Sequence, residues 1–270
     1  MIDCGEGTQL QMRLNKLKMN RLNHIFISHL HGDHCFGLIG LISTLALLGR
    51  TGDLVIYADP QLETLLRPQL DFFCKDIPFQ VIIKGYDATK SELIYEDKSI
   101  TVHTIPLVHR VPCAGFLFRE KPLERSLNSE MAKFYNIPIK AIPLIKQGAD
   151  FTTEDGTIVP NERLTFAPPH AKSYAYCSDT AYSEAIIPII KDVDVLYHES
   201  TFLDSDSYRA KSTGHSTAKH AATIALKANV GKLILGHYSS RYNNTKLFKE
   251  EASQIFTNVE AANEGYCEKL

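Results

Sequence analysis

Four side chains of types that bind metal ions lie within six consecutive residues, His29-Leu-His-Gly-Asp-His34. Imidazole combined with carboxylate is typical of zinc sites. The segment directly follows Ile25–Ser28, which has the composition of a β-strand, and alternate residues at a strand end share one side. We therefore expect His29 and His31 to hold one ion. Gly32 allows a sharp turn, after which Asp33 and His34 open a helix and face a second ion.

These ligands do not complete two metal shells, so further candidates must follow other strands. They are His109, Asp179 and His237, which come after the predicted strands Ser99–Ile105, Ser173–Cys177 and Lys232–Leu235. A single histidine after a strand is more often an ordinary loop residue. The three together indicate a site because all three strand ends could meet at one edge of a sheet sandwich. Asp179 could bridge both ions, since a carboxylate has two oxygens.

A glutamate and a histidine elsewhere in the chain are candidates for proton transfer. Glu199 lies in His198-Glu-Ser-Thr201 at the end of a predicted strand, and His215 precedes a predicted helix in His215-Ser-Thr217. A glutamate beside a histidine orients the ring and holds its charge, as a general acid requires. The alternative is that this segment only caps the helix through Ser216. The residues alone favour the two interpretations equally.

The composition is that of an ordinary globular protein. The 270 residues include 29 Lys+Arg and 31 Asp+Glu, and this balance excludes a generally basic nucleic-acid-binding surface, so any RNA contact needs local patches. Hydrophobic residues make up 44% and charged residues 22%, which excludes disordered and fibrous classes. The 6 cysteines are scattered and fit reduced thiols in the cytoplasm. No apolar stretch is long enough to span a membrane.

Strand-like and helix-like segments alternate along most of the chain. Further strands are predicted at Leu54–Ala58, Gln80–Ile83, Cys113–Phe118, Leu164–Phe166 and Val193–Tyr197. Helices are predicted at Cys35–Leu48, Ser183–Lys191, Ser216–Ala228 and Thr245–Phe256, and another is expected to begin with Asp59 as N-cap and Pro60 at its first position.

Residues 120–160 interrupt this alternation. Four prolines with polar residues between them predict a long excursion from the core, and such excursions are usually functional or mobile. Its lysines and arginines could contact phosphates, but interspersed glutamates dilute their charge. Composition alone therefore favours a solvated surface loop.

At these motifs the chain resembles the metallo-β-lactamase superfamily and, within it, the ribonuclease Z family of tRNA 3′-processing endonucleases. His29–His34 matches the superfamily signature H-x-H-x-D-H. Asp3–Gln9 is similar to the D-C-G-E-G-T-Q of ribonuclease Z, and His198–Thr201 is similar to its H-E-A-T. With His215–Thr217 and His237–Tyr242, the resemblance covers nearly the whole chain.

The resemblance implies an α/β fold, a four-layer αβ/βα sandwich with two Zn²⁺ ions at one edge. One ion would be held by His29, His31, His109 and Asp179, and the other by Asp33, His34, Asp179 and His237. The ions would activate a water for attack on the phosphodiester of precursor tRNA, leaving a tRNA 3′-OH and a trailer 5′-phosphate. Asp33 would also accept the proton of that water. His215, helped by Glu199, would protonate the leaving 3′ oxygen.

The resemblance also bears on the organisation of the chain. It implies one domain over residues 1–270, with a flexible tRNA-binding arm inserted at about 120–160, and a cytoplasmic homodimer. Family members usually begin with strands and a P-x-K-x-R-N-like motif ahead of the segment that matches Asp3–Gln9. We therefore expect those N-terminal strands to be missing here.

Two alternative functions stay open at this point. One is another hydrolase of the metallo-β-lactamase fold, either a phosphodiesterase or a thioesterase. Glu199 and His215-Ser-Thr217 argue against it. The other is an inactive, truncated RNA-binding remnant, against which the intact ligand set argues.

Overall fold

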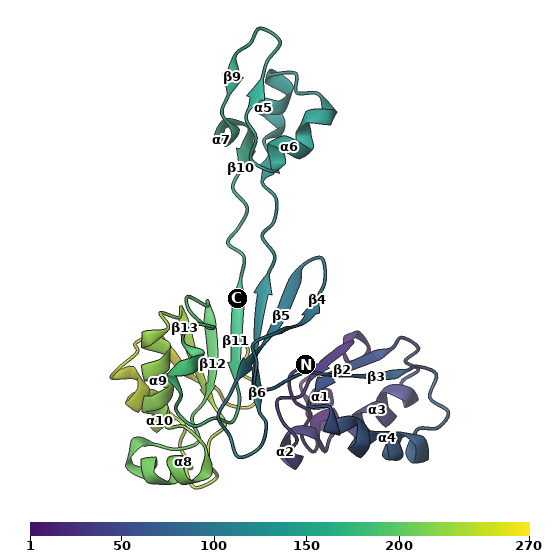
Figure 1. Ribbon diagram of the computed structural model, residues 1–270, viewed down its shortest axis with the longest axis vertical. Helices are drawn as coiled ribbons and strands as arrows, with labels where there is room; N and C mark the ends of the chain where they lie inside the picture. The colour runs from purple at the N-terminus through teal and green to yellow at the C-terminus, as the bar shows by residue number, and fades with distance from the viewer. The chain divides into compact units, whose positions relative to one another are not determined.

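The computed structural model describes residues 1–270, which divide into two compact units (Figure 1). The larger one, here called the core unit, contains Met1–Phe118 and Ser173–Leu270. The smaller one, here called the arm, is Arg119–Lys172. All residues predicted to do chemistry belong to the core unit.

Two β-sheets form the centre of the core unit. The smaller sheet is parallel and has the order β1 (His24–Phe26), β2 (Leu54–Ala58), β3 (Val81–Gly85). The larger sheet has the order β14 (Val259–Ala261), β13 (Lys232–Gly236), β12 (Val195–Glu199), β11 (Ser173–Cys177), β6 (Ala114–Glu120), β5 (Ile100–Pro106), β4 (Leu93–Glu96). Near the first sheet, Ile2 forms a parallel bridge with Phe26.

The helices of the core unit pack on the outer faces of the two sheets (Figure 1). They are α1 (Thr8–Leu14), α2 (Gly32–Cys35), α3 (Leu38–Leu47), α4 (Gln61–Phe73), α9 (Ala218–Lys227) and α10 (Lys246–Ser253). The exception is α8 (Ser207–Thr213), which contributes to neither of the buried clusters that join helices to sheets and lies at one end of the large sheet (Figure 1). The core unit also has the 3₁₀ turns η1 (Met19–Arg21), η3 (Glu184–Ile186) and η4 (Asp204–Asp206).

Three buried clusters separate four layers. One joins α3 and α4 to the small sheet and includes Leu41 and Ile56, and another joins α9 to the large sheet and includes Ile224 and Leu233. Between the sheets lies an aromatic cluster in which the ring centroids of Phe26 and Phe116 are 5.5 Å apart. The order helix, sheet, sheet, helix confirms the predicted four-layer sandwich.

The large sheet brings the predicted strand ends into line. The strands β11, β12 and β13 are parallel, with Cys177 opposite His198 and Glu199 opposite Gly236. Residues that follow these strands therefore emerge at the same edge. This is the edge at which the sequence places Asp179, Glu199 and His237.

Two predicted helices are wrong in detail. Residues 183–191 form only the turn η3, because Pro188 has no N–H to continue a helical ladder and disfavours helix at the residue before it. The predicted helix Cys35–Leu48 is divided into α2 and α3. The division occurs at Gly37, whose N–H donates to the carbonyl of Cys4 at 2.9 Å instead of continuing α2.

The next helix also begins one residue later than predicted. Pro60, expected at the first helical position, is the N-cap of α4. The carboxylate of Asp59 still accepts a hydrogen bond from the N–H of Gln61 at 2.8 Å, so it satisfies a free amide at the start of that helix.

The arm is a folded unit, so the expectation of a solvated loop from its composition is wrong. Ile145, Val159 and Leu164 form a buried cluster in it, and the Asn161 side chain donates to the carbonyls of Ile145 and Ala149, both at 2.7 Å. Its elements are β7 (Ser126–Leu127), α5 (Ser129–Phe134), η2 (Ile139–Ala141), α6 (Ile142–Lys146), β8 (Phe151–Thr152), β9 (Ile158–Val159), α7 (Asn161–Leu164) and β10 (Thr165–Phe166).

All six cysteines are free, in agreement with the sequence, and five of them are buried. Among the helices, none has the length and apolar character needed to cross a lipid bilayer.

Candidate active site

The local structure of His29–His34 follows from the strand and the short helix around it. The chain leaves β1 in an extended conformation, and α2 begins at Gly32. His29 and His31 fall on the same side, with Nε2 of His29 2.9 Å from Nδ1 of His31. Asp33 opens α2, as predicted, and its side chain is 72% exposed, so its carboxylate is accessible from solvent.

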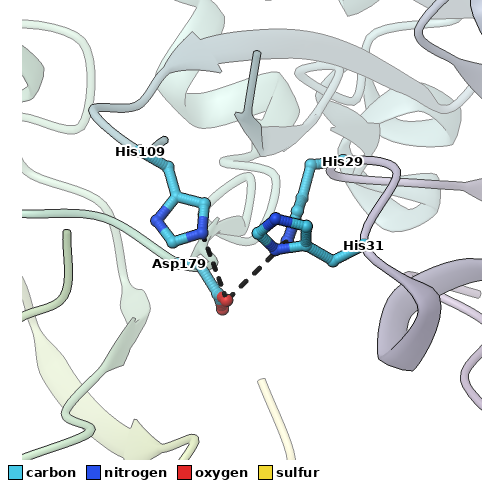
Figure 2. Close-up of side chains that lie close together, drawn as sticks. All are labelled: His29, His31, His109 and Asp179. Atoms are coloured by element: carbon cyan, nitrogen blue, oxygen red, sulfur yellow. Dashed lines mark hydrogen bonds and ion pairs between the residues drawn. The ribbon is translucent and has the colours of Figure 1, made fainter. Parts of the chain in front are cut away.

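The first cluster of ligand atoms comprises His29, His31, His109 and Asp179, with all four atoms within 4.8 Å of one another. Figure 2 shows His109 on one side of the Asp179 carboxylate and His29 with His31 on the other. Oδ2 of Asp179 is 3.7 Å from Nε2 of His29 and 3.9 Å from Nε2 of His109. These are the residues predicted for one ion, and they come from the ends of β1, β5 and β11.

His109 provides a direct test of whether this cluster suits a cation. Its Nδ1 lies 2.9 Å from the carbonyl oxygen of Gly214, so Nδ1 carries the hydrogen and donates it. Its Nε2 then carries no hydrogen and has a lone pair. This nitrogen is buried and has no hydrogen-bond partner. A buried acceptor without a donor is costly, and a metal ion would satisfy it. The donor set therefore fits a metal.

The second cluster comprises Asp33, His34 and His237, again within 4.8 Å. Asp179 contacts this cluster as well, because its Oδ1 is 3.3 Å from Nε2 of His237 and its Oδ2 is 3.6 Å from Nε2 of His34. Asp179 thus lies between the two clusters, in the position that the sequence analysis gave to a bridging carboxylate.

The pKa values of these groups indicate that the site attracts positive charge. Burial disfavours protonation of His34, but hydrogen bonds to Asp179 and Asp3 outweigh it and raise the pKa of His34 to about 10. Burial, together with the charge on His34, lowers the pKa of His29 to about 3. For Asp179, burial opposes ionisation, yet its histidine partners keep its pKa below the usual range. His29 is therefore neutral and Asp179 ionised, the forms in which these side chains bind metals. The proton that Asp3 and Asp179 favour on His34 occupies the place where a bound cation would replace it.

Thr201 orients His237 and was missed by the sequence analysis. Its hydroxyl lies 2.7 Å from Oε2 of Glu199, which can only accept when ionised, so the hydroxyl donates to Glu199. The Thr201 hydroxyl oxygen also lies 2.8 Å from Nδ1 of His237 and accepts the hydrogen on that nitrogen. Nε2 of His237 consequently carries no hydrogen, and its lone pair is available to a metal on the side of Asp179. Thr201 was visible in the His198–Thr201 motif, but its partner is 36 residues away.

Glu199 and His215 form the predicted pair. The Glu199 side chain is fully buried, and its Oε1 is 2.8 Å from Nδ1 of His215. The N–H groups of Thr180 and Thr201 also donate to Glu199, which fixes the carboxylate. Burial opposes protonation of His215, but the hydrogen bond to Glu199 and the charges of Glu199 and Asp179 outweigh it. The pKa of His215 is therefore raised.

Asp3 is a second residue whose role was not predicted, although the motif containing it was noticed. Its carboxylate is 2.8 Å from Nδ1 of His34 and accepts hydrogen bonds from the N–H and hydroxyl of Ser28 at 2.7 and 2.9 Å. It therefore holds His34 with Nε2 toward Asp179. Gly5 allows the Asp3–Gly5 segment to lie close to the backbone of Asp33, because a Cβ at Gly5 would be only 2.2 Å from the backbone oxygen of Asp33.

We predict that Asp3→Asn weakens metal binding about 10- to 100-fold, the usual effect of losing a carboxylate behind a ligand histidine. The asparagine oxygen can still accept from Ser28, so the loop is expected to keep its shape. Competition with a chromophoric zinc chelator measures the change. Asp71→Asn, at an exposed residue of α4, is the control. Equal zinc affinity in the Asp3 and Asp71 variants would contradict this role.

Comparison with solved structures identifies the fold. The chain superposes on the short form of human tRNase Z with a TM-score of 0.69 and 25% identity, covering 98% of this chain and 85% of that chain. It also superposes on the metallo-β-lactamase fold protein YhfI from Bacillus subtilis with a TM-score of 0.64 and 19% identity, covering 98% and 84% of the two chains. The core unit therefore has the metallo-β-lactamase fold.

Sequence comparison identifies the family. Residues 1–71 match a family described as Anti-Pycsar protein Apyc1. Over 98% of its length, the chain is 54% identical to a protein named Ribonuclease Z from Parabacteroides distasonis, of which it covers 87%. It is 49% identical over its whole length to one of the same name from Bacteroides fragilis, of which it covers 89%. The chain belongs to the ribonuclease Z family.

Proposed function

We propose that this protein is a zinc-dependent endoribonuclease that removes the 3′ trailer from precursor tRNA. The products are a tRNA with a 3′-OH and a trailer with a 5′-phosphate. The observation that carries the proposal is two ligand clusters sharing Asp179 beside the Glu199–His215 pair, in a chain about half identical to proteins named Ribonuclease Z.

Two Zn²⁺ ions would occupy the two clusters. His29, His31, His109 and Asp179 would hold one, and Asp33, His34, Asp179 and His237 would hold the other. When bound, the ions would activate a water for attack on phosphorus and offset the charge that develops on the phosphate oxygens.

The protein side chains would move the protons. The exposed carboxylate of Asp33 accepts the proton of the attacking water as the new phosphorus–oxygen bond forms. The bond between phosphorus and the 3′ oxygen of the tRNA nucleotide breaks, and Nε2 of protonated His215 gives that oxygen its proton. Glu199 stabilises the cationic ring, because its buried carboxylate accepts the hydrogen on Nδ1.

The first test is cleavage of a 3′-extended precursor tRNA, with the metal content of the same sample. Cleavage next to the discriminator nucleotide with about two zinc ions per chain is expected. Removing the metal with a chelator should abolish cleavage, and added zinc should restore it. A small-molecule thioester as the best substrate would favour the alternative hydrolase. Absence of both metal and cleavage would favour the inactive remnant.

We also propose that the arm binds the tRNA. Lys133 and Lys140 lie in it, both exposed and without an ion pair, close to the exposed apolar side chains of Phe134 and Ile139. Lysines of this kind bind phosphates, and exposed aromatic rings stack on bases.

Replacing residues 121–171 with a short Gly–Ser turn is predicted to weaken precursor binding and spare hydrolysis of bis(p-nitrophenyl) phosphate. The deletion is practical because the N–H of Glu120 donates to the carbonyl of Lys172 at 2.8 Å, so the two ends are adjacent. The double variant Lys133→Ala, Lys140→Ala keeps the fold and should reduce the salt dependence of binding by roughly one unit of slope per lysine. Loss of both activities on deletion would mean that the arm is structural.

We further propose a cytoplasmic homodimer. The free cysteines fit a reducing compartment. Exposed leucines on α1 and at the end of α3, among them Leu14 and Leu47, would be covered by a second copy. A molar mass in solution of one chain, at the concentration used for assays, would contradict the dimer.

A further inference from the structure

A cavity of about 530 Å³ lies beside the proposed general acid. His215 forms part of its wall, together with Tyr182, Tyr208, Lys211 and His220. The volume lies in the range of sites for small organic groups. Neither cluster of ligand atoms includes the other four residues, so the proposed chemistry leaves the cavity without an occupant.

The elements that build the cavity also build the active site. Tyr208 and Lys211 are three residues apart on α8, so they share one helix face. This helix ends at Gly214, whose φ of 75° turns the chain directly into His215. Tyr182 lies three residues after Asp179 in the same loop. A group in the cavity would thus lie against His215.

The side chains in the cavity are available for contact. Tyr208 is 63% exposed, and the Arg209 guanidinium lies 5.1 Å from its ring centroid, which leaves the opposite ring face for a ligand. Lys211 is exposed and forms no ion pair. The Tyr182 ring, in contrast, is held by a 2.7 Å hydrogen bond from its hydroxyl to Glu184 and by contact with the His220 ring. A free aromatic face beside an unpaired lysine is the combination that binds single-stranded nucleotides.

We propose that this cavity receives the nucleoside on the 5′ side of the scissile phosphate, with its base stacked on Tyr208. The inference rests on the proposed function. His215 gives its proton to the leaving 3′ oxygen, and that oxygen is bonded to the ribose of this nucleoside. The ribose must therefore lie against His215, and the cavity extends from there to Tyr208. Lys211 lies on the same helix face and binds the phosphate on the 5′ side of the same nucleotide.

The experiment compares two precursor tRNAs, one intact and one abasic at the nucleotide 5′ of the scissile bond. In the wild-type protein the missing base is expected to lower kcat/KM by about 5- to 100-fold, the effect of losing one stacked base. Tyr208→Ala should lower kcat/KM for the intact precursor by a similar factor and cleave both precursors equally well. Tyr208→Phe keeps the ring and should keep the difference between the precursors.

Phe72→Ala is the matched control, because Phe72 is 79% exposed on α4 and lies outside the site. It should behave as the wild type with both precursors. Zinc content and thermal unfolding of Tyr208→Ala establish that the variant is folded, and Tyr208→Leu replaces it if it is not.

Two outcomes would overturn the inference while leaving the proposed function intact. The first is that the wild-type protein cleaves both precursors equally well. The second is that a folded Tyr208→Ala or Tyr208→Leu variant shows the same ratio of kcat/KM between the intact and abasic precursors as the wild type. Wild-type protein with two zinc ions that cleaves neither precursor would instead overturn the proposed function, and this inference with it.

Discussion

Replacing Asp33 with alanine is expected to abolish cleavage of precursor tRNA, with a loss of at least about 10⁴-fold in rate. The change removes the proposed proton acceptor, and general acid–base groups alone contribute about 10²- to 10⁴-fold. It also removes a ligand from the cluster that contains His34 and His237. The zinc content should therefore fall from about two to about one per chain, because His29, His31, His109 and Asp179 remain.

The Asp33 side chain is 72% exposed, so the loss should not come from unfolding. The free energy of unfolding of metal-free Asp33→Ala is expected to lie within about 0.5 kcal/mol of that of the metal-free wild type, as is usual for substitutions at exposed residues. Asp33→Asn separates the two roles, because its amide oxygen can still bind a metal but cannot accept a proton. Asp71→Ala, at an exposed acid on α4, is the control. Full cleavage activity in Asp33→Asn would contradict its role as a base.

The second large effect is expected for His215→Ala, which should keep about two zinc ions and lose about 10²- to 10⁴-fold in the rate of precursor cleavage. His215 belongs to a third group, with Asp179 and His237, whose ligand atoms lie within 4.8 Å of one another, but the two proposed zinc shells are filled without it. A nucleoside 3′ oxygen leaves poorly without a proton, whereas p-nitrophenolate leaves without one. The same variant should therefore lose much less activity on bis(p-nitrophenyl) phosphate, a difference that structural damage would not produce.

Glu199→Gln tests the other half of the pair. Glutamine fills the same space and keeps one acceptor oxygen in place of two, and it removes the charge that raises the pKa of His215. A smaller fraction of His215 is then protonated at neutral pH. We therefore expect the rate of precursor cleavage by Glu199→Gln to lie between the rates of the wild type and of His215→Ala. His103→Ala, on β5, is a histidine control. Equal losses on both substrates in His215→Ala would refute general acid catalysis by His215.

The sequence by itself determined the ligands that lie close together along the chain. His29, His31, Asp33 and His34 meet because a strand end followed by a tight turn and a short helix positions side chains locally. His109, Asp179 and His237 were also predictable as candidates, since each follows a strand and parallel strands end at a common edge. The His198–Thr201 and His215–Thr217 motifs favoured proton transfer and helix capping equally, and the resemblance to ribonuclease Z implied the Glu199–His215 pair.

Only the tertiary structure decided which ring nitrogen each histidine presents. Nδ1 of His109 is held by the carbonyl of Gly214, 105 residues away, and Nδ1 of His34 is held by Asp3, 31 residues away. Hydrogen bonds of this kind depend on side-chain orientation across separate elements, for which residue types and spacing along the chain carry no signal.

The arm and the cavity required the tertiary structure for a related reason. The prolines and charges of residues 120–160 resemble a loop, whereas burial of Ile145, Val159 and Leu164 makes a small core that appears only once the segment closes on itself. The cavity forms because α8 and the loop after Asp179 converge on His215. A sequence specifies periodicity and ligand types, but a cavity exists only in the packing of elements that are distant along the chain.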